Sequence, residues 1–129
     1  MTDSMTELSA QDERLLRRSI EVSASAVANG NMPFGAIMAD PDGNVLLEAE
    51  NTGITGRNDL NHAETVLMNM AVTILAPEQI ATATLYTSCE PCAMCAGAMY
   101  WYNYVESLLH TGHCRLRPSS QLAACLPYL

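Results

Sequence analysis

Residues 82–100 read TATLYTSCEPCAMCAGAMY, and this stretch determines how the rest of the chain is interpreted. Its first part, residues 82–87, is rich in β-branched and aromatic side chains and predicts a strand. Its second part, from Pro91 to about Tyr100, consists of small and apolar residues and predicts a helix, because proline fits the first helical position at no hydrogen-bonding cost. A strand that leads into a helix is typical of an α/β domain.

The segments before this stretch continue the alternation of helices and strands. Residues 12–29 carry apolar side chains at helical spacing and run into an Asn-Gly pair, which predicts an amphipathic helix with a C-terminal stop. Residues 33–39 and 45–49 are short apolar runs, and residues 40–43 (DPDG) between them are typical of a turn. We therefore expect these two runs to form a hairpin.

The remaining segments complete the predicted order of elements. Residues 51–61 are rich in Gly, Asn, Thr and Asp and predict a loop, whereas apolar residues recur at helical spacing from His62 to Pro77. Residues 104–109 predict a last strand. Strands that alternate with helices favour an α/β sandwich with a partly parallel sheet. We expect one domain over residues 1–129, in which residues 112–129 predict no particular element.

Composition narrows the class of function. The chain has 129 residues and a net charge of −8, and it contains no Lys, so that all six basic residues are Arg. Attraction to nucleic acid by bulk charge is therefore not expected. No apolar run approaches the roughly 20 residues that span a bilayer, and residues 1–11 lack a secretory signal pattern. These features predict a cytoplasmic protein whose five cysteines serve as thiols or metal ligands.

Three side chains that can bind a metal stand at the starts of two predicted helices. His62 opens one helix, and Cys92 and Cys95 fall in the first turn of the other, where positions i and i+3 share a face. The positive end of the helix dipole favours thiolates there. Three protein ligands leave a position for water, which is typical of a catalytic zinc. A structural zinc with Cys89 as the fourth ligand is the alternative.

Glu64 follows His62 by two residues and is expected beside the metal without being bound to it. Because two thiolates offset the charge of Zn²⁺, a carboxylate is needed to take the proton from water and pass it on. A carboxyl group near a cation and apolar walls exchanges protons near neutral pH. Glu64 is thus the candidate catalytic residue.

Residues 62–64 (HAE) followed by residues 91–95 (PCAMC) resemble the zinc signature of the cytidine and nucleobase deaminase superfamily. The resemblance covers about residues 14–109 and implies a three-layer α/β/α sandwich with a mixed central sheet, of the cytidine deaminase type. Further stretches are similar to the guanine deaminase or free-base branch: residues 86–92 (YTSCEPC), 97–101 (GAMYW) and 33–36 (PFGA), and Asn51.

The resemblance implies a role for each site residue. One zinc per chain would be held by the histidine and the two cysteines named above, with Glu64 as proton shuttle. Asn51 would hydrogen-bond the edge of the base, the backbone N–H of Ala63 would help to orient it, and Phe34 would supply an apolar wall. The reaction would convert an amino group on an aromatic carbon to a carbonyl and release ammonia.

The choice of substrate rests on charge and on the C-terminal segment. A small free base is favoured over RNA because the chain has no Lys. Guanine deaminases carry an acidic residue near the C-terminus that helps to bind the purine, whereas no Asp or Glu follows Glu106 here. This absence weakens guanine as the substrate and makes a smaller pyrimidine plausible. Because Asn51 offers one acceptor and one donor, which suit the amide-like edge of a 2-amino-4-oxo ring, we expect guanine or isocytosine. The alternatives are adenosine in tRNA, cytosine, and a zinc-binding module without turnover.

A homodimer is the expected assembly, because apolar helix surface around Met94, Met99 and Tyr102 requires a partner to cover it. The resemblance to the deaminase superfamily also implies a dimer. The sequence leaves open whether Trp101 or the histidines at positions 110 and 113 reach the pocket.

Overall fold

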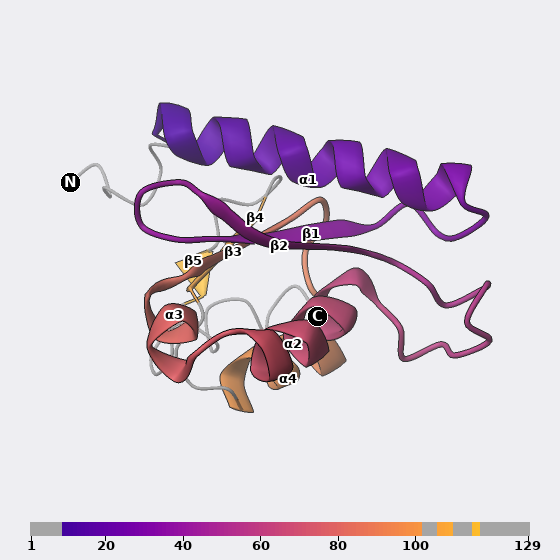
Figure 1. Cartoon of the computed structure of the whole chain (residues 1–129). Helices are drawn as coiled ribbons and strands as arrows, with labels where there is room; N and C mark the ends of the chain where they lie inside the picture. The colour runs from indigo at the N-terminus through magenta and orange to yellow at the C-terminus, as the bar shows by residue number, and fades with distance from the viewer. Residues whose placement is uncertain (1–8, 102–105, 110–114, 117–129) are drawn as a thin grey trace.

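Helices and strands alternate along the chain in an order close to the predicted one. The computed structural model describes residues 9–101, 106–109 and 115–116. In chain order the elements are α1 (Ala10–Ala28), β1 (Gly35–Ala39), β2 (Val45–Glu50), α2 (Ala63–Ile74), α3 (Pro77–Thr82), β3 (Thr84–Thr87), α4 (Ala93–Trp101), β4 (Glu106–Leu109) and β5 (Arg115–Leu116) (Figure 1).

The strands form one mixed sheet in the order β2-β1-β3-β4-β5. β1 is antiparallel to both β2 and β3, β3 is parallel to β4, and β5 is antiparallel to β4. The parallel strands β3 and β4 are connected through α4, because parallel neighbours require a long crossover connection. The expected hairpin of β1 and β2 and the expected partly parallel sheet are both confirmed.

Helices cover both faces of this sheet: α1 lies on one face, and α2, α3 and α4 lie on the other (Figure 1). All five residues of β1 are buried, as expected for a central strand that is covered on both sides. The expected three-layer α/β/α sandwich is therefore confirmed. The core on the α1 side consists of Leu15, Leu16, Val22, Ile37, Ala39 and Tyr86. The opposite core includes Met38, Leu67, Leu85, Cys95 and Met99.

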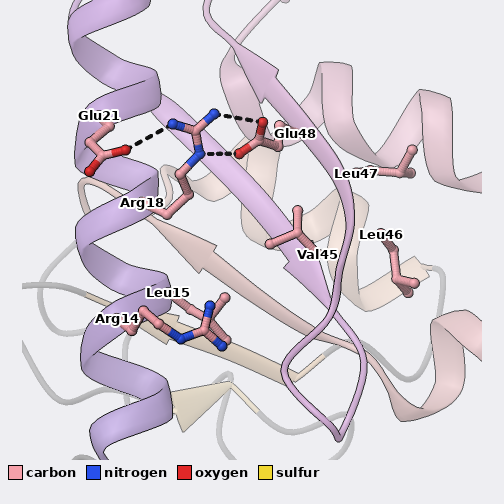
Figure 2. A pocket seen from close by; sticks show the side chains of 8 residues that line it. All are labelled: Arg14, Leu15, Arg18, Glu21, Val45, Leu46, Leu47 and Glu48. Carbon is pink, nitrogen blue, oxygen red and sulfur yellow. Dashed lines mark hydrogen bonds and ion pairs between the residues drawn. The ribbon is translucent and has the colours of Figure 1, made fainter.

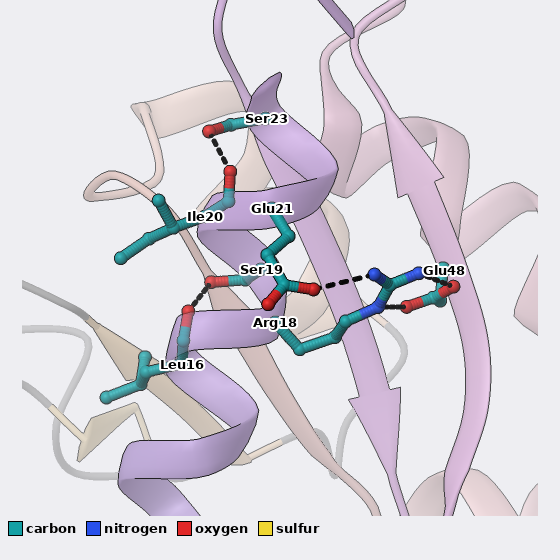
Figure 3. Close-up of polar contacts among 7 residues, drawn as sticks. All are labelled: Leu16, Arg18, Ser19, Ile20, Glu21, Ser23 and Glu48. Atoms are coloured by element: carbon teal, nitrogen blue, oxygen red, sulfur yellow. Dashed lines mark hydrogen bonds and ion pairs between the residues drawn. The ribbon is translucent and has the colours of Figure 1, made fainter. Parts of the chain in front are cut away.

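The close contact between α1 and β1 depends on Gly35. A Cβ at this position would lie 2.5 Å from the backbone N of Ser23 and 2.6 Å from the backbone O of Ser19. Both serines donate their hydroxyls back into the helix, Ser19 to the carbonyl of Leu16 and Ser23 to that of Ile20, at 2.6 Å each (Figure 3). The buried Ser19 hydroxyl thus finds its hydrogen-bond partner within α1 and needs none from the sheet. The backbones of α1 and β1 can therefore be in direct contact.

A surface ion pair also joins α1 to β2. Arg18 donates to both carboxylate oxygens of Glu48 at 2.5 and 2.9 Å and to Glu21 at 2.8 Å (Figure 3). The hydrogen bonds from Arg18 lower the pKa of the Glu48 carboxyl below its ordinary value. Because 46% of the Arg18 side chain is exposed, solvent screening limits the pair to less than about 1 kcal/mol. The pair borders an open hollow between α1 and β2 (Figure 2).

The structure corrects several predicted bounds. Residues 77–82 form α3, where the sequence predicted no helix; Pro77 opens it, and Gln79 Oε1 accepts from the Ala76 N–H at 2.9 Å. The strand predicted from residue 82 begins at Thr84, because Thr82 is the last residue of α3. β1 begins at Gly35 rather than at residue 33, and α4 begins at Ala93 rather than at residue 91. α1 begins at Ala10, two residues before the predicted start, because Ser9 Oγ accepts from the Asp12 N–H at 3.0 Å.

Some sequence-based expectations lie outside the described residues. They concern Tyr102, residues 104–105 of the predicted strand, His110, His113 and most of residues 112–129. Within that last segment only Arg115–Leu116 is described, and it forms β5. None of the helices in the described part of the chain is long and apolar enough to cross a membrane.

Candidate metal centre

His62 is held at the start of α2. It is the N-cap residue, with an extended backbone (φ −69°, ψ 154°), and its side chain makes no capping hydrogen bond. Its N–H donates to the carbonyl of Leu60 and its own carbonyl accepts from the N–H of Val66, at 2.9 Å each. The backbone is therefore fixed on both sides, and the imidazole remains available for another contact.

The turn between β3 and α4 brings two cysteines to the start of α2. Thr87 Oγ1, at the end of β3, donates to the backbone carbonyl of Cys89 and so folds the connection back. The carbonyl of Cys92 accepts from the Ala96 N–H at 2.9 Å, which places Cys92 immediately before α4 and Cys95 in its first turn. The sequence predicted both cysteines in the first turn, so the position of Cys92 is corrected by one residue.

The donor atoms of three side chains converge. The Cys92 and Cys95 sulfurs lie 3.5 Å apart, and each lies 3.5 Å from Nδ1 of His62. A tetrahedral zinc, with Zn–S of about 2.3 Å and Zn–N of about 2.1 Å, requires donor separations of roughly 3.6–3.8 Å. The three residues therefore fit zinc, and within the described part of the chain they form the only cluster of this kind.

Burial controls the protonation of one ligand. Cys95 is fully buried, and burial, together with the nearby Glu64 carboxylate, raises the pKa of its thiol. Cysteine binds zinc as a thiolate, so metal binding at this centre requires Cys95 to lose its proton.

Glu64 lies beside the three donors and is not one of them. It is the second residue of α2, only 5% of it is exposed, and its Oε2 lies 3.4 Å from the sulfur of Cys95. Burial raises the pKa of the Glu64 carboxyl because desolvation disfavours the charged form. A buried carboxyl group in this position is chemically suited to accept and return a proton.

Asn51 is the buried polar residue directly after β2. Its N–H donates to the carbonyl of Phe34 at 3.0 Å, and its Oδ1 accepts from the N–H of Gly53 at 2.9 Å. Phe34 is half-buried and packs against the core under α2. Within the described residues the Asn51 Nδ2 has no hydrogen-bond partner, so this donor is available to a ligand.

A backbone hydrogen bond closes the loop between Asn51 and His62. Thr52 N–H donates to the carbonyl of Asn61 at 3.1 Å. Asn51 precedes Thr52 and His62 follows Asn61, so the two residues stand at the two ends of the closed loop. Ala63, the next residue, is fully buried and opens α2, where backbone N–H groups lack partners within the helix.

Other candidate residues remain apart from the centre. Cys89 is exposed and is not part of the donor cluster, so the described geometry does not supply the fourth ligand that a structural zinc would need. Trp101 is 83% exposed at the end of α4. Ser88, which the sequence pattern did not single out, joins the end of β3 to β1: its Oγ accepts from the Gly35 N–H and its N–H donates to the Gly35 carbonyl, at 3.0 Å each. A polar residue between a buried strand and a ligand-bearing turn is the signal that could have identified it.

One histidine and two cysteines from two helix starts, beneath one face of a mixed sheet, are the arrangement of the zinc-dependent deaminase class. The chain belongs to this class: the cytidine and deoxycytidylate deaminase zinc-binding region matches residues 9–111. The family expected from the sequence is therefore confirmed, and with it a zinc-binding domain, in which His62, Cys92 and Cys95 are positioned to bind a metal ion.

Relatives with different substrates are similar to this chain. A probable cytosine deaminase of Schizosaccharomyces pombe is 42% identical over 98 residues, covering 76% of this chain and 59% of the relative. The guanine deaminase of Bacillus subtilis is 38% identical over 90 residues, covering 69% and 57%. A tRNA-specific adenosine deaminase of Haemophilus influenzae is 33% identical over 88 residues, covering 68% and 51%. The chain thus spans between half and three fifths of the length of these relatives.

The crystal structure of the Bacillus subtilis guanine deaminase superposes on this chain with a TM-score of 0.69 at 34% identity. The superposition covers 76% of this chain and 62% of that protein. The similarity therefore includes the arrangement of elements as well as the sequence.

Proposed function

We propose that this chain catalyses the hydrolytic deamination of a small free nucleobase, with a 2-amino-4-oxo ring, guanine or isocytosine, as the favoured substrate. The observation that carries the proposal is the buried Glu64 carboxyl, 3.4 Å from a ligand sulfur at a three-donor zinc centre. Three protein ligands leave a coordination position for water, and a carboxyl group beside that position supplies general acid–base chemistry.

When bound by His62, Cys92 and Cys95, zinc supplies a Lewis acid that makes a water molecule nucleophilic near neutral pH. Glu64 would take one proton of that water and deliver it to a ring nitrogen as the water oxygen bonds to the amino-bearing carbon. It would then take the remaining proton from that oxygen and deliver it to the departing amine. The C–N bond to the amine breaks, ammonia leaves, and a carbonyl replaces the amino group. The burial of Glu64 suits both directions of transfer, because a raised pKa makes a carboxylate a better base.

The base is oriented by groups around this centre. The free Nδ2 of Asn51 donates to a ring carbonyl, since its Oδ1 already accepts from Gly53. The Ala63 N–H, at the helix start, is a second donor for the edge of the base. Phe34 supplies an apolar wall against the ring. A pocket of this kind rejects analogues that leave Asn51 buried and unpaired.

Charge favours a free base over tRNA. The chain has a net charge of −8 and no Lys, and three of its arginines, Arg14, Arg17 and Arg18, lie on α1, across the sheet from the metal centre (Figure 1). Arg17 and Arg18 are also paired with acidic residues. RNA binding depends on phosphate contacts, whereas a neutral base meets no repulsion from the net charge. The higher identity to the cytosine and guanine deaminases than to the tRNA enzyme supports the same choice.

Cytosine is the second candidate substrate, and the observation that favours it is the 42% identity to a probable cytosine deaminase. Cytosine and isocytosine are regioisomers that carry the same kinds of groups, so both can pair with one amide side chain. Deamination of tRNA adenosine is the third candidate, because tRNA-specific relatives match the same region.

Ammonia release from a panel of substrates tests the proposal. The zinc-loaded protein is incubated with guanine, isocytosine, cytosine, adenine and a tRNA anticodon stem-loop at low and high salt. We expect ammonia from guanine or isocytosine, at a rate that hardly changes with salt, because a neutral ligand releases no counterions on binding. Turnover of cytosine alone would show that cytosine is the substrate in place of guanine or isocytosine. Inosine formation that falls steeply with salt would show that tRNA is the substrate.

We further propose that residues 1–129 hold one zinc-dependent deaminase domain that acts as a homodimer. Met99, which the sequence placed at the apolar surface, is instead buried in the core, whereas Leu60, Ile74, Tyr100 and Trp101 are exposed on the layer that carries the centre. Burying such surface against a second copy would remove it from water. Sedimentation velocity at micromolar concentration separates this dimer from the monomer that would contradict it.

A further inference from the structure

The loop over residues 52–61 is tightly bonded, although it lacks regular secondary structure. Backbone N–H groups find partners inside the loop: Gly56 donates to Thr52 at 2.9 Å, Asn58 to Gly53 at 3.0 Å, and Arg57 to Ile54 at 3.2 Å. Later amides donate to Asn58, where Leu60 reaches its Oδ1 and Asn61 its carbonyl, at 3.0 Å each. These hydrogen bonds define the path of the loop.

Two consecutive amides of this loop have no partner inside it. The N–H groups of Ile54 and Thr55 both donate to Oδ1 of Asn31, at 3.1 and 2.9 Å. Asn31 Nδ2 and Thr55 Oγ1 form a further contact at 3.0 Å. Asn31 is 7% exposed and belongs to the segment between α1 and β1, so a residue from outside the loop completes its hydrogen bonding.

Asn31 is itself held in place. Its N–H donates to the carbonyl of Ala26 at 2.9 Å, and Gly30, with φ +91°, donates to Val27 at 3.0 Å, which together form a Schellman motif at the end of α1. The side chain of Asn31, with its hydrogen bonds to residues 54 and 55, is called the Asn31 clamp below. Because Asn31 is fixed to the end of α1, the clamp attaches the loop to that helix.

We propose that Asn31 is a positioning residue for substrate binding, which acts by fixing the loop that connects Asn51 to His62. The inference rests on the proposed function, because it assigns Asn51 to the base. The Thr52–Asn61 hydrogen bond closes the loop, and the Asn31 clamp fixes its far side. With both in place, the spacing between the base-binding amide and the metal ligand is set before the base arrives.

Removal of the Asn31 side chain is expected to shift the loop more than it lowers the stability of the fold. Ile54 and Thr55 are exposed, so water can satisfy their N–H groups when Asn31 is removed. The loop then loses its attachment to α1 while its internal hydrogen bonds remain. Since misplacing a binding group by about 1 Å can cost up to about 100-fold, we expect KM to rise by about 10-fold or more.

Three variants separate the clamp from general stability. Asn31→Ala removes every side-chain contact, Asn31→Asp keeps an oxygen that accepts from both amides, and Thr55→Val removes only the hydroxyl. Asn29→Ala is the matched control, because the Asn29 side chain donates to Glu50 of β2 at 2.7 Å and makes no hydrogen bond to residues 52–61. Each zinc-loaded variant is measured for zinc content, for hydrogen exchange of the loop amides, and for kcat and KM with the base.

The expected result is a raised KM for Asn31→Ala with zinc content retained, kcat reduced less than KM is raised, and faster exchange at the amides of residues 54 and 55. Asn31→Asp restores most of the affinity, Thr55→Val gives an intermediate KM, and Asn29→Ala is unchanged. An Asn31→Ala protein whose loop amides exchange faster while KM stays the same would overturn the inference. So would an equal rise in KM for Asn29→Ala.

Calorimetric binding of the product, xanthine or uracil, separates this inference from the proposed function. Wild-type protein that binds the product with Asn31-dependent affinity but releases no ammonia would refute the catalytic proposal and support the clamp. Wild-type protein that turns over the base with an affinity independent of Asn31 would refute only the clamp. A wild-type protein that neither binds nor turns over a base would refute both.

Discussion

The Glu64→Gln protein is expected to fold and bind zinc normally but to release ammonia at least about 10²–10⁴-fold more slowly than the wild type. Glutamine preserves the shape of a side chain that is only 5% exposed, so the packing of α2 is retained. It cannot carry a proton between water, ring nitrogen and leaving amine. The loss should appear in kcat, because the interaction is required in the transition state rather than for binding.

Glu78→Gln is the matched control for this experiment. Glu78 is an exposed residue of α3, and the same change there should leave zinc content and turnover as in the wild type. If Glu64→Gln retained activity within a few-fold of the wild type, another group would move the protons and the assignment of Glu64 would be wrong.

The Cys92→Ala, Cys95→Ala double variant is expected to lose its zinc almost completely, whereas the wild type binds about one ion per chain. The change removes both sulfurs, which lie 3.5 Å from each other and from the imidazole, and leaves only Nδ1 of His62. One imidazole does not hold zinc against a chelator. Activity should disappear with the metal, and metal analysis after dialysis measures the loss.

Cys89→Ala is the control for the cysteine change. Cys89 is exposed and does not belong to the donor cluster, so its replacement should leave the zinc content at about one ion per chain. Normal zinc in the double variant would contradict the ligand assignment. Loss of zinc from Cys89→Ala would instead indicate that this thiol is a ligand.

The layers of the fold follow from periodic patterns in the sequence. Apolar residues at helical spacing predicted α1 and α2, and the DPDG turn predicted the β1–β2 hairpin; the structure confirms each of these elements. These patterns are reliable because they express which side chains must leave water. The short helix Pro77–Thr82 has too few residues to display such a period, and it was missed for that reason.

The order of the strands within the sheet could not be predicted from the sequence. β1 lies between β2 and β3, and β4 lies between β3 and β5. This order depends on how α1 and α4 cover the two faces, which a pattern of apolar residues does not specify.

Candidate ligands could be predicted because metal-binding side chains at i and i+3 of one helix are a local feature. Asn31 could not be predicted in this way. Its partners, Ile54 and Thr55, are more than 20 residues away, and a buried asparagine has the same sequence appearance as an ordinary turn residue. Its role becomes visible only when the loop amides are traced to their acceptors.

The dependence of ammonia release on bound zinc tests the central claim most directly. The wild-type protein is stripped of metal with a chelator and then titrated with zinc, while ammonia release from guanine and isocytosine is measured at each step. We expect that release from at least one base is absent without metal, rises in proportion to bound zinc, and reaches its maximum near one ion per chain. Ammonia release that persists without zinc, or a fully zinc-loaded protein that releases none from either base, would contradict it.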